Sequence, residues 1–198
     1  MEQTILKKAA ELFIKFGFKS VTMDDIANEL TISKKTIYVY YENKSELVEA
    51  VVNYFFEEIT KIIQGIISLN LNAIEESFKI HETVSQLFKD ENESIEYQLR
   101  KYFPEIHEKN NCTRTDLFQQ TISNNLEKGI SEGYYRPSID VNFTSKFFIA
   151  TITSLKNNDN SELVDYPITY AKNQFFDIYF RGIVTEKGLE ILKKQLNK

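Results

Sequence analysis

The sequence predicts an all-α fold, and three of its features support this prediction. Glycine and proline are scarce, with six and three among 198 residues. Alternating polar and apolar runs bounded by turn residues, which indicate strands, are absent. Between residues 21 and 47, capping residues and apolar spacing define two short helices joined by a tight turn and followed by a third, longer helix. We therefore expect helices along the whole chain.

The first helix is expected over residues 2–16. Its apolar side chains recur on one face, and Gly17 provides a C-terminal stop. The residues that this face is expected to bury are Ile5, Ala9, Leu12, Phe13 and Phe16.

The next two helices form a helix-turn-helix. The first of them should begin after Thr22, whose hydroxyl can accept a hydrogen bond from a free N–H group, while Asp25 completes an acidic capping box. It should end near Leu30. Ser33 offers a new cap after only two residues, so the following helix must turn sharply away.

This following helix presents polar and aromatic side chains on its outer face. Residues 36–41 are all β-branched or aromatic, which favours a strand, but the Ser33 cap and the inward spacing of Ile37 and Tyr41 favour a helix. The outer face offers cations for phosphates, and hydroxyls, a methyl group and rings for base edges. Its residues are Lys34, Lys35, Thr36, Tyr38 and Tyr40. Position and chemistry both indicate a DNA-recognition helix.

Three segments follow one another over about the first 50 residues: AAELFIKFGF, SVTMDDIANEL and ISKKTIYVYYENKSEL. In this order they resemble the DNA-binding domain of the TetR family of transcriptional regulators. The rest of the chain resembles the family more loosely, through its length, its helical pattern and the segment GISEGYYRP. The resemblance implies a DNA-binding domain at residues 1–46 and a helical domain at residues 47–198 that binds an effector and dimerises.

The resemblance also implies roles for individual residues. Those expected to contact phosphates are Thr22, Thr36, Tyr40 and Lys44. Those expected to face the major groove are Lys34, Lys35 and Tyr38.

Two positions depart from the common pattern of the family. Thr31 stands where glycine is frequent, and a β-branched residue with positive φ is strained, so we expect a displaced turn or an energetic cost. Tyr41 replaces the more common phenylalanine, and its hydroxyl needs a partner or an exit to water.

Charge and composition narrow the class of protein. The formal net charge is -5, whereas dedicated nucleic-acid binders are often basic. Residues 33–44, however, hold three lysines and one Glu. The basic surface expected to bind DNA is therefore local. No apolar run approaches the ~20 residues that span a bilayer. The N-terminal residues form an amphipathic pattern, unlike a signal peptide. The single cysteine, Cys112, fits a reducing compartment, and we expect a cytoplasmic protein.

Catalysis is not expected. His81, His107 and Cys112 share no metal-binding spacing, and there is no glycine-rich phosphate loop. We therefore expect no enzyme, cofactor or metal. The alternative to a DNA-binding regulator is a helical ligand-binding or protein-interaction module without specific DNA binding.

Further helices are expected after a long fourth helix that begins behind Asn43 and continues to about residue 68. Pro104 should kink or break one of them, Asp140 and Thr185 should act as caps, and residues 157–165 should form a loop. The expected helices are 72–89, 94–108, 114–131, 140–156, 167–183 and 185–197.

The helices at 140–156 and 167–183 are apolar over most of their circumference, which predicts two buried faces. One face suits the core and the other a partner subunit, although both helices could instead be central in a monomer. The resemblance implies that they pair with their copies in a four-helix dimer interface. The interface residues expected are Phe147, Phe148, Ile152, Phe175 and Tyr179.

The resemblance places an effector pocket between residues 72 and 131, where aromatic and aliphatic lining suits a small, largely apolar ligand. The candidates, each of which could be ordinary core, are Phe78, His81, Leu99, Tyr102, Phe103, Phe118 and Ile122. A two-fold dimer implies a near-palindromic operator in double-stranded DNA with half-sites ~34–36 Å apart. Repression relieved by the effector is the expected outcome, with the fourth helix as the lever.

Overall fold

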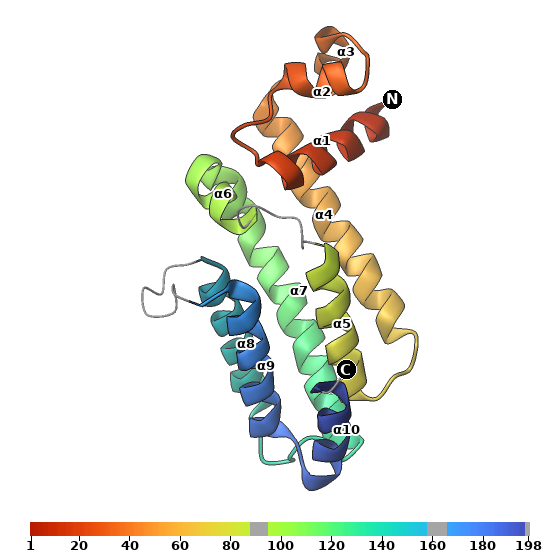
Figure 1. Cartoon of the computed structure of the whole chain (residues 1–198), viewed down its shortest axis with the longest axis vertical. Helices are drawn as coiled ribbons and strands as arrows, with labels where there is room; N and C mark the ends of the chain where they lie inside the picture. The colour runs from red at the N-terminus through yellow and green to blue at the C-terminus, as the bar shows by residue number, and fades with distance from the viewer. Residues whose placement is uncertain (88–94, 158–165, 197–198) are drawn as a thin grey trace. The chain divides into compact units, whose positions relative to one another are not determined.

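The computed structural model describes residues 1–87, 95–157 and 166–196, and for residues 95–96, 110–114 and 156–157 it describes the backbone alone. Within these ranges the secondary structure is helical, without strands, which confirms the all-α class (Figure 1). The helices are α1 (Glu2–Phe16), α2 (Met23–Glu29), α3 (Lys34–Tyr38), α4 (Lys44–Ile67), α5 (Ala73–Leu87), α6 (Ile95–Tyr102), α7 (Pro104–Ser131), α8 (Val141–Asn157), α9 (Ile168–Ile183) and α10 (Glu186–Leu196).

The chain forms two compact units, each discontinuous in sequence. Unit 1 comprises residues 1–62 and 84–111, and unit 2 comprises residues 63–83 and 112–198. The compact units do not follow the expected division at residue 46, because α6 and parts of α4 and α7 bury apolar residues in the same core as α1–α3. The functional division at residue 46 stays a prediction.

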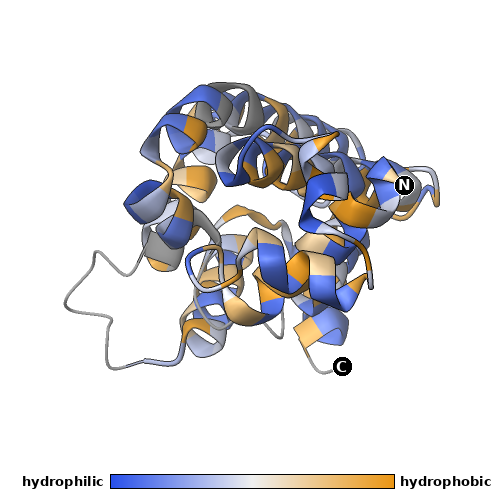
Figure 2. Ribbon diagram, turned by 90° about the horizontal axis from the view of Figure 1, so that it is seen from above, coloured by the Kyte–Doolittle hydropathy of each residue, from blue (hydrophilic) through white to orange (hydrophobic). Residues whose placement is uncertain are grey.

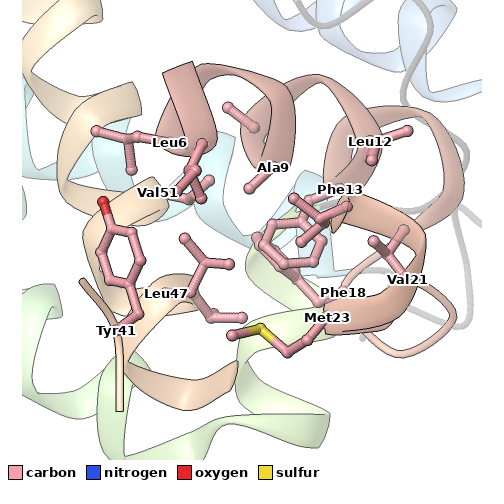
Figure 3. Close-up of a cluster of buried hydrophobic side chains, with 14 of the residues drawn as sticks. Leu6, Ala9, Leu12, Phe13, Phe18, Val21, Met23, Tyr41, Leu47 and Val51 are labelled. Carbon is pink, nitrogen blue, oxygen red and sulfur yellow. The ribbon is translucent and has the colours of Figure 1, made fainter. Parts of the chain in front are cut away.

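The core of unit 1 is built around the rings of Phe13 and Phe18, whose centroids lie 5.1 Å apart (Figure 3). Of the expected α1 face, the side chains from Ile5 to Phe13 are buried as predicted. The prediction that Phe16 is buried is wrong, since this side chain is 51% exposed. The chain turns at Gly17, and Phe18 rather than Phe16 packs in the core against Phe13.

The core of unit 2 combines aromatic packing with a buried polar network. α8 and α9 run side by side (Figure 1). The side chain of Asn125 on α7 accepts hydrogen bonds from Ser77 Oγ at 2.8 Å and from Tyr135 OH at 3.2 Å. Its amide donates to the carbonyl of Ala73 and to Glu76 Oε1, at 2.9 and 2.8 Å. This network fixes the start of α5 against α7.

Two predicted boundaries between residues 102 and 114 have opposite outcomes. The expected break at Pro104 is confirmed, because α6 ends at Tyr102 and α7 begins at Pro104, where the missing N–H group is not needed. The expected gap between residues 108 and 114 is wrong, since α7 runs unbroken to Ser131 and this stretch holds no glycine or proline to stop it. The loop expected at residues 157–165 lies outside the described residues, apart from Asn157 at the end of α8.

Polar residues interrupt the apolar stretches of the helices (Figure 2). In the part of the chain that the structure describes, no helix combines the length and the apolarity needed to cross a membrane.

Candidate nucleic-acid interface

The capping box at the start of α2 is present as expected. Thr22 Oγ1 accepts a hydrogen bond from the N–H of Asp25 at 3.2 Å, and the N–H of Thr22 donates to Asp25 Oδ2 at 2.8 Å. Hydrogen bonding from Thr22 lowers the pKa of the Asp25 carboxyl. The hydroxyl of Thr22 is thereby held at an exposed helix N-terminus, a position suited to a phosphate contact.

The turn between α2 and α3 is not displaced, and it carries a conformational cost. Thr31 has φ 56°. The N–H of Thr31 bonds the carbonyl of Asn28, and the N–H of Ile32 bonds the carbonyl of Ala27, both at 3.0 Å. This is a Schellman ending, which places its left-handed residue at Thr31, where glycine is usual.

α3 begins at its expected cap but is shorter than expected. Ser33 Oγ accepts a hydrogen bond from the N–H of Thr36 at 3.2 Å. The helix ends at Tyr38 rather than at Tyr41, and a further turn follows in which the N–H groups of residues 40 and 41 bond the carbonyl of Ile37. Ile37 and Tyr41 are buried, so the inward spacing is confirmed.

The outer face of α3 is accessible to a partner. Lys34 and Lys35 are exposed, and Tyr38 and Tyr40 keep 44% and 38% of their surface exposed. Sequence reasoning missed Val39, which is 72% exposed between these tyrosines. The signal was available, because residue 39 does not belong to the inward spacing of Ile37 and Tyr41.

The three lysines proposed to contact DNA have different surroundings. Lys34 Nζ lies 2.7 Å from Asp24 Oδ2, and this hydrogen bond raises the pKa of Lys34. Lys44 Nζ donates to the carbonyl oxygen of Lys19 at 3.2 Å, and partial burial lowers the pKa of Lys44. Lys35 projects into solvent. Lys34 and Lys44 are therefore positioned before any ligand arrives.

The side chain of Tyr41, whose hydroxyl a phenylalanine would lack, is buried in unit 1 at the edge of the cluster that contains Leu47 (Figure 3). Burial raises the pKa of Tyr41. Among the described side chains, the buried polar atom without a hydrogen-bond partner is the hydroxyl of Tyr179, not that of Tyr41.

The seven effector candidates divide between the two units. Leu99 is fully buried in the core of unit 1, Phe103 packs against that core, and Tyr102 belongs to the same unit. The apolar face of α6 thus packs into the core that contains α1–α3, and a pocket lined by all seven residues stays a prediction. The candidates in unit 2 are Phe78, His81, Phe118 and Ile122.

Aromatic contacts connect two of the unit 2 candidates to α9. The ring of His81 packs against that of Phe176 with centroids 3.8 Å apart and planes tilted by 32°, and the ring centroids of Phe78 and Phe180 lie 5.1 Å apart. Burial lowers the pKa of His81. His81 therefore lies in a partly buried, aromatic environment.

The dimer candidates also separate into two groups. Phe147 is exposed, and Phe148 and Ile152 are partly buried. Phe175 and Tyr179 lie in the core of unit 2, because α8 and α9 pack on each other and fill the space between them. The large apolar side chains that stay exposed include Phe143 on α8 and Ile178 on α9, at 67% and 68%.

Within the described residues, no group of three or more His, Cys, Asp or Glu side chains is arranged to hold a metal ion. The side chain of Cys112 lies outside the described residues.

Comparison with known proteins identifies the family of the N-terminal domain. The chain is 26% identical over 153 residues to the HTH-type transcriptional repressor KstR2 of Mycobacterium tuberculosis, covering 72% of this chain and 73% of that protein. It is 25% identical over 167 residues to the negative regulator IcaR of the Staphylococcus epidermidis biofilm operon, covering 75% and 88%. The family model described as "Bacterial regulatory proteins, tetR family" matches residues 5–51. Residues 5–51 form a TetR-family DNA-binding domain.

Solved structures extend this TetR-family likeness over nearly the whole chain. A TetR-family regulator from Agrobacterium tumefaciens has a TM-score of 0.73 at 17% identity, with 93% of this chain and 97% of that chain covered. A Saccharomonospora viridis regulator in complex with choline has a TM-score of 0.71 at 18% identity, with 93% and 98% covered. At these identities the likeness shows the fold.

Proposed function

We propose that this protein is a transcriptional repressor that binds a palindromic operator as a homodimer and releases it when a small, largely apolar effector binds. The observation that carries the proposal is the helix-turn-helix, in which both caps and the Schellman turn hold the outer face of α3 toward solvent. The match to the TetR family and the repressor names of KstR2 and IcaR support it.

The residues divide into two roles. Thr22, Thr36, Tyr40 and Lys44 contact phosphates and fix the position of α3 on the duplex. Lys34, Lys35 and Tyr38 contact base edges in the major groove. Val39 adds an exposed isopropyl group, which suits the methyl group of thymine.

The exposed apolar face of α8 and α9 is the dimerisation surface. Phe143, Phe147 and Ile178 project from these helices of unit 2. Burying them against a second copy gives a two-fold dimer, which places two recognition helices on a palindrome. We expect Ile178→Asp to give a monomer in sedimentation velocity, and Leu196→Asp, at an exposed apolar residue of α10, to leave the dimer intact. A dimeric Ile178→Asp variant would contradict this surface.

Effector release requires a ligand that binds the form without DNA affinity more tightly, and the coupling must be reciprocal. The unit 2 candidates Phe78, His81, Phe118 and Ile122 are the residues we assign to the effector. α4 and α7 each contribute residues to both units, and α6 completes the core beneath α1–α3. A compound that binds unit 2 tightly and leaves operator affinity unchanged would refute induction by that compound.

Repression is tested with a reporter fused to the promoter beside the operator. Deleting the gene for this protein should raise reporter expression, and restoring it should lower expression again. A fall in expression on deletion would show activation instead. We propose that the protein acts in the cytoplasm.

A further inference from the structure

The helix-turn-helix is not a basic surface. Residues 22–44 contain three lysines, and they also contain the carboxylates of Asp24, Asp25, Glu29 and Glu42. A protein that binds DNA mainly through phosphates needs an excess of cations, since each neutralised phosphate releases counterions. The acids of α2 must therefore weaken the sequence-independent part of binding.

Asp24 and Asp25 have different local roles. Asp25 completes the capping box with Thr22. Asp24 has no part in that box, and its carboxylate instead lies 2.7 Å from the ammonium group of Lys34, ten residues along the chain. The ion pair thus joins the first turn of α2 to the first residue of α3. Both side chains remain accessible, with 61% of Asp24 and 42% of Lys34 exposed.

The position of Lys34 is constrained from two sides. Its Nζ also lies 5.9 Å from the centroid of the Tyr38 ring, one turn further along α3. An ammonium group has three donors, so Lys34 can keep Asp24 as a partner and still donate to a guanine O6 or N7 atom. A phosphate is a different kind of partner, because its negative charge competes with the carboxylate for Lys34 and is repelled by it.

We propose that Asp24 is a specificity-determining residue, which holds Lys34 for base contacts and withholds it from phosphates. This inference rests on the proposed function. On an operator, Lys34 donates a hydrogen bond to a base and keeps its ion pair with Asp24. On any other sequence, Lys34 can gain only a phosphate, and Asp24 opposes that contact. The carboxylate therefore lowers non-specific binding more than operator binding.

The test compares Asp24→Asn with the unaltered full chain on two duplexes of equal length, one carrying the palindrome that the protein selects and one scrambled. We expect Asp24→Asn to bind the scrambled duplex about threefold to tenfold more tightly, with a salt slope steeper by ~0.9, as for one added phosphate contact. The ratio of the two affinities should fall by a similar factor. Glu29→Gln removes an exposed carboxylate elsewhere on α2 and should leave the ratio unchanged.

A second variant separates the ion pair from a general charge effect. If Asp24 acts through Lys34, Asp24→Asn should have no effect on the ratio in a Lys34→Ala background. An Asp24→Asn ratio equal to that of Glu29→Gln, or an effect that persists without Lys34, would overturn the inference and leave the proposed function standing. An unaltered chain that prefers no sequence over the scrambled duplex would overturn both.

Discussion

At the scale of single residues, Thr31 is the clearest site of strain. Its φ of 56° crowds a β-branched side chain against the backbone, and the Schellman hydrogen bonds keep it there. Thr31→Gly removes this strain, although it also gives the unfolded chain more freedom. We expect a net gain of about 1 kcal/mol in the free energy of unfolding, measured with urea. Thr31→Ala keeps Cβ and should gain less, and a loss of stability in Thr31→Gly would contradict the strain.

Lys44 should contribute to affinity without contributing to specificity. Its Nζ is anchored on the carbonyl oxygen of Lys19 beside the N-terminus of α2, where a phosphate is expected. Lys44→Ala should weaken binding to all duplexes alike and reduce the magnitude of the salt slope by ~0.9. Lys61→Ala, on the same helix but in an ion pair with Glu58, is the matched control and should change neither.

Tyr38 should have the opposite behaviour. We expect Tyr38→Ala to relax the preference at one base pair in each half-site, at a cost of about 1–3 kcal/mol on the operator. The measurement is binding to duplexes substituted one base pair at a time. Tyr40→Ala, a proposed phosphate contact, should lose the same affinity on every duplex. If Tyr38→Ala behaves like Tyr40→Ala, Tyr38 is a backbone contact.

His81 should make unit 2 less stable in mild acid. Burial against Phe176 lowers its pKa below the usual 6.5, so the unfolded chain binds the proton more readily than the folded protein. The contribution of neutral His81 to the free energy of unfolding is therefore fully present above pH 6.5, and it is lost as the pH drops through the lowered pKa of the folded protein. Unfolding followed from pH ~7 to ~5.5 should show this loss, and it should shrink in His81→Gln. His107→Gln is the control, and an equal change in both variants would exclude His81 as the cause.

At the scale of elements, α6 belongs to the same core as α1. The side chain of Gln98 is buried, and its Oε1 accepts a hydrogen bond from the N–H of Phe18 at 2.7 Å. A Cβ on Gly17 would come within 2.7 Å of the same oxygen, and Gly17 also needs its φ of 83°. The turn after α1 and the side chain of Gln98 are thus fitted to each other.

Removing this contact should destabilise unit 1. Gln98→Ala leaves the N–H of Phe18 buried without its acceptor, which should cost about 1–3 kcal/mol in the free energy of unfolding. Urea denaturation measures the loss, and Gln64→Ala at an exposed position of α4 provides the control. An unchanged midpoint in Gln98→Ala would show that the hydrogen bond adds nothing to the stability of unit 1.

Element boundaries were predictable where a local signal fixes them. The caps at Thr22, Ser33 and Asn43 and the break at Pro104 involve side chains within a few residues of the helix ends, so the sequence alone shows them. The length of α3 was not predictable in this way. Its β-branched and aromatic residues give no stop signal, and the end at Tyr38 depends on how Ile37 and Tyr41 pack in the core.

At the scale of the whole molecule, the limit of sequence reasoning lies in long-range packing. The helix-turn-helix is contiguous, so its face could be assigned from spacing. Leu99 and Phe103 were expected to line an effector pocket or to be ordinary core, and nothing in their spacing shows that they pack in the core of α1–α3, some 80 residues away. For the same reason the spacing did not show that Phe175 and Tyr179 are buried in the core of unit 2, whereas Phe143 and Ile178 are exposed.

The central claim is sequence-specific binding of DNA by a dimer. The most direct test is selection of genomic DNA fragments by the purified full chain at low salt, followed by a search for a shared motif. We predict a near-palindrome whose half-sites are centred about 10 base pairs, or a multiple of this, apart. Selected fragments without a shared motif, from protein that is folded and dimeric, would contradict the claim.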